Sequence, residues 1–220
     1  MKKGEKPSMK RCVIIGGAGI ARYDRINRFL RKDDFCVFCD SGLRHLPFLQ
    51  AEPGLIVGDF DSHEKPDTGT EIIELPCEKD DTDTFYGVKE AVRRGYDDFL
   101  LVGVTGERMD HTLANLSILQ YLDTAGKRAC ILDDRSEMSI ISRNEAEVSG
   151  DCTYFSILAV GGPARGIRIT GAKYPLEDGT ITGDFQYGVS NEVLPGETAR
   201  ISVREGRLLL VKVFGDDPTV

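Results

Sequence analysis

Three turns rich in carboxylates contain the residues of this sequence best suited to chemistry. They span residues 58–62 (Gly-Asp-Phe-Asp-Ser), 79–83 (Lys-Asp-Asp-Thr-Asp) and 106–111 (Gly-Glu-Arg-Met-Asp-His). Each follows a short apolar run, and the carboxyl ends of parallel strands meet at one edge of an open α/β sheet. Carboxylates gathered there repel one another unless a cation joins them. The sequence therefore predicts an oxygen-ligand site for Mg²⁺ that serves a phosphate substrate.

The first two turns also have a purely local explanation. Asp59 and Asp61 belong to a residue type that favours turns, because its side chain hydrogen-bonds the nearby backbone. Asp80 and Asp81 precede a predicted helix, where acids satisfy free N–H groups and the helix dipole. Asp83 lies inside the first turn of that helix and has less need to be acidic. The shared position of the turns after apolar runs favours a site.

The third turn places an arginine beside carboxylates. The guanidinium fork of Arg108 suits a polyphosphate. The alternative is a surface arginine next to a helix for which Asp110 is the N-cap. His111 either contacts phosphate or only sits at the start of the helix, and both interpretations stay open.

A glycine-rich turn follows the first apolar run. Its sequence, Gly16-Gly17-Ala18-Gly19, starts a dinucleotide-binding pattern, but Arg22 stands where the last glycine belongs. No P-loop pattern occurs in the sequence. We expect a tight strand-to-helix turn whose amide groups could face a ligand.

Composition indicates a globular protein that is not a general nucleic-acid binder. The 220 residues are 40% hydrophobic and 29% charged, with a net charge of −8 and therefore no overall basic character. We expect neither a membrane span nor a secretory signal, because no apolar run is long enough and the basic N-terminus lacks an apolar core. The six cysteines lie mostly in apolar runs, so we expect reduced core thiols and a cytoplasmic protein.

The periodicity of the sequence predicts two domains. Between residues 10 and 143, strands alternate with helices, which favours a mostly parallel sheet with helices on both faces. The expected strands are 12–15, 35–39, 55–57, 71–75, 99–102, 128–132 and 138–141, and a helix is expected over 82–94. Between residues 150 and 214 only short β-type runs occur, which predicts an all-β sandwich or barrel.

Several of these segments occur in an order that resembles the thiamine pyrophosphokinase family. The resemblance extends over roughly residues 11–213 and rests on Asp40-Ser41-Gly42, Gly58–Ser62, Asp81–Asp83, Gly103–His111, Lys173–Leu176 and Ser190–Glu192. It implies an α/β catalytic domain, a β-sandwich domain, and a homodimer with sites between subunits. It also implies transfer of a pyrophosphoryl group from ATP to thiamine, giving thiamine diphosphate and AMP.

The same resemblance assigns roles to individual residues. Asp59, Asp61 and Asp83 would hold Mg²⁺, and Ser190 and Asn191 would bind thiamine. The chain has no Trp, so any ring stacking on thiamine would come from Tyr174 or another Tyr or Phe. The nucleotide and its phosphates would contact Asp40, Lys79, Asp81, Thr105, Arg108, Asp110 and His111. Arg108 would act on the reacting phosphates. Apart from the resemblance, the chemistry itself allows a carboxylate to orient or deprotonate the thiamine hydroxyl, and Asp61 and Asp110 are the two candidates.

Two departures from the family pattern affect its motifs. Ser41 and Glu107 stand where that family usually has glycine, so altered local backbones are expected there. Two other functions stay open: an Mg²⁺-dependent phosphoesterase acting on a nucleotide-like substrate, and a non-catalytic sensor that binds thiamine or a nucleotide.

Overall fold

The computed structural model describes residues 9–60, 66–78 and 80–215. Contacts divide the chain into two compact units. The first reaches Ile118 and includes Ala125–Ala129, and the second comprises Leu119–Thr124 and the chain from Cys130 onward. No helix in the described part of the chain is long and apolar enough to cross a membrane.

The first unit is built on five parallel strands in the order β4-β3-β2-β1-β5. Their bounds are β1 (Arg11–Ile15), β2 (Phe35–Cys39), β3 (Pro53–Gly58), β4 (Ile72–Glu74) and β5 (Asp98–Val102). The last four residues of β1, β2 and β5 are all buried, as expected for strands covered on both faces. The predicted parallel sheet is confirmed.

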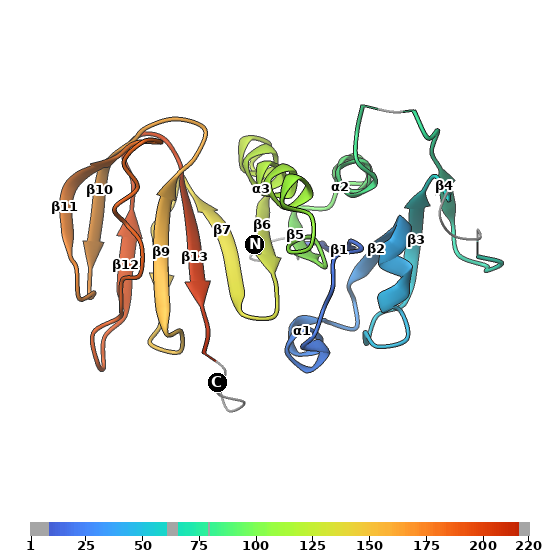
Figure 1. Ribbon diagram of the computed structural model, residues 1–220, viewed down its shortest axis with the longest axis horizontal. Helices are drawn as coiled ribbons and strands as arrows, with labels where there is room; N and C mark the ends of the chain where they lie inside the picture. Colours follow the sequence, from blue (N-terminus) through green and yellow to red (C-terminus); the bar gives the residue numbers. More distant parts are fainter. Residues whose placement is uncertain (1–8, 61–65, 79, 216–220) are drawn as a thin grey trace, which may run out of the picture. The chain divides into compact units, whose positions relative to one another are not determined.

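The helices of the described residues are α1 (Tyr23–Phe29), the 3₁₀ helix η1 (Asp40–His45), α2 (Asp83–Arg93) and α3 (Met109–Thr124), of which α3 passes into the second unit at Leu119. Figure 1 shows α2 on one side of the strands and α1 on the other. The hydroxyl of Thr82 caps α2 by accepting a hydrogen bond from Phe85 N at 3.2 Å. The predicted N-cap role of Asp110 is wrong: α3 already begins at Met109, so Asp110 lies in the first helical turn.

The second unit holds two antiparallel sheets, with strand orders β6-β7-β13-β9 and β11-β10-β12-β8. The strands are β6 (Arg128–Leu132, in this unit from Cys130), β7 (Ser136–Ile141), β8 (Ala146–Val148), β9 (Tyr154–Ala159), β10 (Ala164–Thr170), β11 (Leu176–Ile181), β12 (Ala199–Ser202) and β13 (Leu208–Val213). Both sheets bury side chains in one core, including Phe155, Ile167 and Leu208. This confirms the predicted β-sandwich.

Two details of the strand prediction are corrected. Strand β8 lies in residues 144–151, where only a boundary was expected. Strands β6 and β7 were expected to close the parallel series, but they pair antiparallel, with Cys130 opposite Ser139. The domain limits, 10–143 and 150–214, stay a prediction.

Candidate active site

A cavity of about 340 Å³ lies at the carboxyl ends of β1, β2 and β5 in the first unit. From β1 the chain proceeds to β2 on one side, and β5 pairs with β1 on the other. The point where strand order reverses is where open α/β sheets bind ligands. The cavity is lined by Gly17, Ala18, Cys39, Asp40, Ser41, Thr82, Asp83, Thr84, Gly103, Val104, Gly106, Glu107, Arg108, His111 and Asn115.

The glycine-rich turn after β1 packs directly against the turn after β5. Gly16 N donates to Val102 O at 2.9 Å, and Ala18 N donates to Gly103 O at 2.8 Å. A Cβ added at Gly16 would lie 2.6 Å from Gly103 O, so a larger residue does not fit there. The turn is therefore the tight connection that the sequence predicted, and Gly17 and Ala18 form one wall of the cavity.

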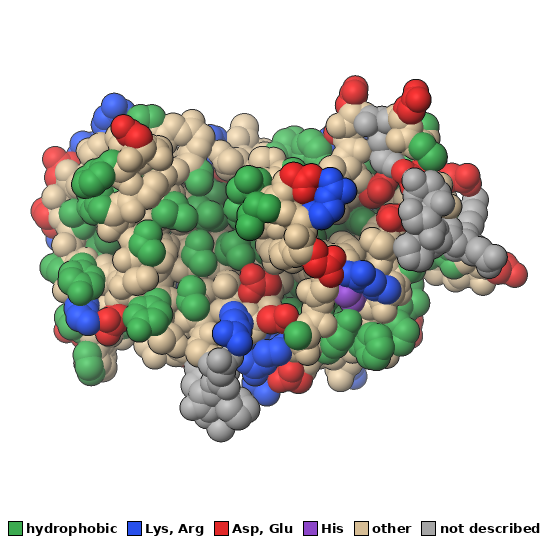
Figure 2. All heavy atoms as spheres, viewed as in Figure 1, with side chains coloured by type: hydrophobic (Ala, Val, Ile, Leu, Met, Phe, Trp, Pro, Cys, Tyr) green, Lys and Arg blue, Asp and Glu red, His purple; other side chains and the backbone are tan. Residues whose placement is uncertain are grey.

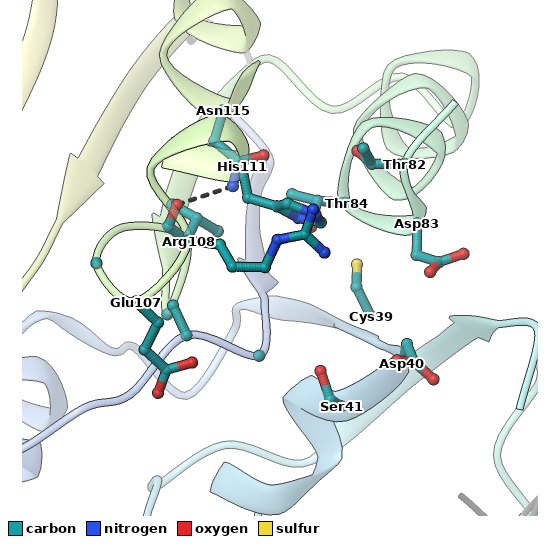
Figure 3. Close-up of a pocket in the computed structure, with 15 residues that line it drawn as sticks. Cys39, Asp40, Ser41, Thr82, Asp83, Thr84, Glu107, Arg108, His111 and Asn115 are labelled. Atoms are coloured by element: carbon teal, nitrogen blue, oxygen red, sulfur yellow. Dashed lines mark hydrogen bonds between the residues drawn. The ribbon is translucent and has the colours of Figure 1, made fainter. Parts of the chain in front are cut away.

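Two aspartates place carboxylates in this cavity. Asp40 is the first residue of η1, and Asp83 is the first residue of α2. Figure 3 shows that the two side chains come from different helices, with Cys39 close to both. Asp40 Oδ1 is buried and accepts no hydrogen bond from the described residues. The Oδ1 atom of Asp83 is buried as well. Such oxygens suit a hard cation or a donor on a ligand.

The donor set fits Mg²⁺ shared with a substrate better than a metal caged by protein alone. Among the residues that the structure describes, no group of three or more His, Cys, Asp or Glu side chains could hold a metal ion. Mg²⁺ is usually bound through one or two carboxylates, water and substrate phosphates. Asp40 and Asp83 can supply that number of carboxylates.

Arg108 provides a cationic group at the same cavity. Figure 3 shows its side chain extending from the turn after β5 across the cavity, near His111. Its Nη2 donates to Asp110 Oδ2 at 2.5 Å, and its Nε donates to Asp110 Oδ1 at 3.2 Å. These hydrogen bonds lower the pKa of Asp110 to about 2. Asp110 is therefore a weak base near neutral pH while this pair is intact.

Asn115 and Glu107 line the cavity without having been predicted there. Asn115 is buried, and its Nδ2 donates to Val104 O at 2.8 Å, the dashed line in Figure 3. Asn115 lies one helical turn after His111, so both side chains share one face of α3. A polar residue at this spacing was the sequence feature that could have predicted Asn115 as part of the cavity. Glu107 Oε1 accepts a hydrogen bond from Gly19 N at 3.2 Å and pairs with Arg44 Nη2 at 3.3 Å.

The other predicted residues of this site that the structure describes do not line the cavity. Asp81 forms an ion pair with Lys89, and Thr105 lies between two lining residues. Asp59 directly follows β3 and is half-buried. Asp61 and Lys79 lie outside the described residues.

A second cavity, of about 270 Å³, lies in the second unit. Its lining includes Tyr174 and Asn191, two of the residues that were predicted to bind thiamine. It is lined by Ile157, Ile169, Tyr174, Pro175, Leu176, Ile181, Tyr187, Gly188, Val189 and Asn191. Asn191 is buried and holds the backbone of Tyr174, accepting from its N at 3.0 Å and donating to its O at 2.8 Å. Ser190 is exposed outside the lining, and its N donates to Ser156 Oγ at 3.0 Å.

This combination is typical of α/β enzymes that act on phosphate substrates: a parallel sheet, a cavity where its strand order reverses, and carboxylates facing an arginine. Residues 26–131 match the family model of the thiamin pyrophosphokinase catalytic domain. Residues 138–208 match the model of the thiamin pyrophosphokinase vitamin B1 binding domain. The two matches together cover most of the chain, which belongs to the thiamin pyrophosphokinase family of enzymes.

Individual relatives agree with this assignment. The chain is 26% identical over 163 residues to thiamine pyrophosphokinase of Bacillus subtilis, covering 70% of this chain and 76% of the relative. The crystal structure of thiamine pyrophosphokinase from that organism superposes with a TM-score of 0.83 at 21% identity, covering 94% of this chain and all of the other. Thiamin pyrophosphokinase from Candida albicans gives a TM-score of 0.73 at 14% identity, covering 93% and 89%. These structures support the fold.

Proposed function

We propose that this chain transfers a pyrophosphoryl group from ATP to thiamine, producing thiamine diphosphate and AMP. The observation that carries the proposal is the cavity in which Asp40 and Asp83 face Arg108, inside the segment matched by the catalytic-domain model. In the reaction the thiamine hydroxyl oxygen bonds to the β-phosphorus of ATP. The bond from that phosphorus to the α–β bridging oxygen breaks, AMP leaves, and the hydroxyl proton passes to a base.

The residues of the cavity would bind and orient the triphosphate. Arg108 is positioned to pair with phosphate oxygens, and His111 could donate to them as well. When bound, Mg²⁺ would offset charge on those oxygens. We propose that Asp83 holds it with Asp59 and Asp61, and that Asp40 supports the site. A Cβ at Gly58 would lie 3.1 Å from the Cα of Asp40, so the turn that begins with Asp59 starts beside Asp40.

The predicted nucleotide contacts of Asp81, Thr105 and Asp110 remain part of the proposal, although the cavity lining does not include these three residues. The predicted contact of Lys79, which lies outside the described residues, also remains part of it. Each could contact parts of ATP that extend beyond the cavity. For the base, Asp61 and Asp110 stay the two candidates. Binding of phosphate to Arg108 would weaken its pair with Asp110, and the pKa of Asp110 would then rise toward its ordinary value.

We propose that thiamine is recognised by the second unit, through Ser190, Asn191 and Tyr174. Thiamine carries a permanent thiazolium charge, and an aromatic face can attract a cation by about 0.5–2 kcal/mol. Asn191 would act by holding Tyr174 in place, because its amide already bonds the Tyr174 backbone. Ser190 is exposed and could offer its hydroxyl to the aminopyrimidine ring.

The proposal also covers the oligomeric state, the cellular location and the domain limits of the protein. We propose a cytoplasmic homodimer, supported by the resemblance and by six cysteines that are all free thiols. We also propose domain limits of 10–143 and 150–214. The two matched segments, at residues 26–131 and 138–208, support a division of the chain into two domains.

The direct test is AMP release from ATP and Mg²⁺, measured with and without thiamine. The proposal predicts AMP only when thiamine is present. A phosphoesterase would release phosphate products without thiamine, and a sensor would bind both ligands without turnover. Either of those outcomes would replace the proposed function.

A further inference from the structure

The 3₁₀ helix η1 contacts the walls of the cavity at both of its ends. Its first residue, Asp40, lines the cavity. Its last two residues, Arg44 and His45, contact the turns that follow β5 and β1. Neither of them lines the cavity.

His45 holds the turn after β1. Its side chain is buried, with Nε2 3.0 Å from Ala18 O and Nδ1 2.8 Å from the hydroxyl of Tyr23. A carbonyl oxygen can only accept, so Nε2 carries the proton and Nδ1 accepts from Tyr23. Burial lowers the pKa of His45, which favours this neutral form. The bond to Ala18 therefore ties a residue of the cavity wall to the end of η1.

Arg44 holds the turn after β5. Its Nη2 lies 3.3 Å from Glu107 Oε1, and the same oxygen accepts a hydrogen bond from Gly19 N at 3.2 Å. Glu107 has a φ of 47°, in the left-handed region, and immediately precedes Arg108. One carboxylate thus connects the turn after β1, helix η1 and the turn that carries Arg108.

The charge of Glu107 makes the contact with Arg44 important for an anionic ligand. Glu107 lines the cavity, and an unpaired carboxylate there would repel phosphate. Arg44 offsets this charge from outside the lining. Exposed ion pairs add little to stability, so we expect the effect on the cavity and not on folding.

We infer that Arg44 and His45 are positioning residues for the nucleotide site, which fix the cavity walls through Glu107 and Ala18 without touching the substrate. This inference rests on the proposed function, because it takes ATP as the ligand of the cavity. The inference also accounts for the contacts at the last two residues of η1, because these contacts hold the helix whose first residue, Asp40, lines the cavity.

The first experiment separates the hydrogen bond of His45 from its bulk. The dissociation constant of α,β-methylene ATP, whose α–β link cannot be cleaved, is measured by calorimetry with Mg²⁺. His45→Leu removes the donor, and we expect about tenfold weaker binding together with faster hydrogen exchange in residues 16–19. His45→Gln can still donate to Ala18 O and should bind within about threefold of wild type. Equal binding by wild type and a folded His45→Leu variant would overturn the role of His45.

The second experiment examines Arg44 and Glu107 as a pair. Arg44→Gln should weaken binding about fivefold, whereas Arg44→Gln in a Glu107→Gln background should change it by less than about twofold. Arg200→Gln is the matched control, because Arg200 is also an exposed arginine with glutamate partners but lies in the second unit. Independent effects of the two substitutions, or an Arg44→Gln variant that binds like the control, would overturn the role of Arg44.

The design remains decisive if one variant fails to fold. If His45→Leu does not fold, Tyr23→Phe replaces it, because this substitution removes only the hydroxyl that bonds His45 Nδ1. We expect the Tyr23→Phe variant to bind the analogue about threefold more weakly. Unchanged binding and unchanged hydrogen exchange would then overturn the positioning role of His45. If wild type binds the analogue but forms no AMP with thiamine, the proposed function fails while the positioning roles stand. If AMP forms and all variants bind alike, only the positioning roles fail.

Discussion

Several residues with strained backbones coincide with the motifs that the sequence singled out. Asp40, Phe60, Glu107 and Ser190 have φ values of 44°, 54°, 47° and 59°, which residues other than glycine rarely adopt. Such strain gathers at functional sites, where the surrounding structure enforces it. The sequence predicted an unusual backbone at Glu107 because this residue stands where the family usually has glycine. In the structure Glu107 has the left-handed conformation that glycine adopts readily.

The cavity residues differ in how far their types and spacing could reveal them. Asp83, Arg108 and His111 were predictable because they follow apolar runs at one sheet edge. Asn115 was missed because its burial depends on where α3 begins, and the predicted N-cap at Asp110 placed that start two residues too late. Residue types thus indicated several residues that line the cavity, whereas the orientation of a helix about its axis required the structure.

At the residue scale, Asp83→Asn should lower the rate of AMP formation by about 10²-fold or more, because it removes a preorganised charge at the phosphates. The rate is measured across a Mg²⁺ titration. Asp24→Asn is the matched control, since Asp24 also lies in the first turn of a helix but is exposed. Turnover of Asp83→Asn close to that of the control at limiting Mg²⁺ would remove Asp83 from the site.

The elements follow from local patterns to different degrees. Apolar runs predicted β2 and β6 at the observed bounds. Strand β8 has three residues, and only Val148 is buried, so it offers too short a pattern to detect. The short turn between β6 and β7 contains Asp133, a residue type that favours turns. In the structure Asp133 Oδ1 accepts hydrogen bonds from Arg135 N at 2.8 Å and Ser136 N at 2.6 Å. An aspartate turn this short favours an antiparallel hairpin over a crossover.

At the element scale, helix α2, which positions Asp83, contains a buried carboxylate. Glu90 is 8% exposed and accepts hydrogen bonds from Arg93 and Arg94, each at 2.7 Å. These bonds lower the pKa of Glu90 from 4.5 to about 2. Because the folded-state pKa is depressed, the stabilisation is present above the unfolded value and is lost as pH falls toward 2.

Glu90→Gln should therefore lower the free energy of unfolding at pH 7 by about 1–3 kcal/mol. The deficit relative to wild type should shrink between about pH 4.5 and 2, as the wild-type carboxylate is protonated. Urea unfolding at several pH values measures both effects, with Glu197→Gln, at an exposed position, as the control. A deficit that stays constant over this pH range would show that Glu90 acts through packing alone.

At the scale of the whole molecule, each unit has a separate role in the proposed reaction. The first contains the cavity proposed for the nucleotide, and the second contains the residues proposed to bind thiamine. The change from alternating to purely β-type pattern predicted this organisation, since periodicity reports which kind of layer a segment can form. The assembly of two chains could not be derived from periodicity, and it rests on the resemblance.

The second unit exposes several large apolar side chains, which is consistent with a homodimer interface. Phe185 is 65% exposed and Val189 54%. Figure 2 shows hydrophobic side chains on the face of the second unit that is in view. Light scattering over a dilution series should give the mass of two chains. Phe185→Ser should raise the dimer dissociation constant about tenfold or more, whereas Met9→Ser, at another exposed apolar residue, should not. A fully active monomer at micromolar concentration would contradict the dimer.

The central claim, attack of thiamine on the β-phosphorus, is tested most directly by ³¹P NMR of the purified chain with ATP, Mg²⁺ and thiamine. Transfer of a pyrophosphoryl group predicts that AMP and thiamine diphosphate accumulate in equal amounts as ATP disappears, with no free phosphate formed at the same rate. Accumulation of ADP and thiamine monophosphate would place the attack on the γ-phosphorus. Either that result or loss of ATP without any thiamine ester would contradict the account.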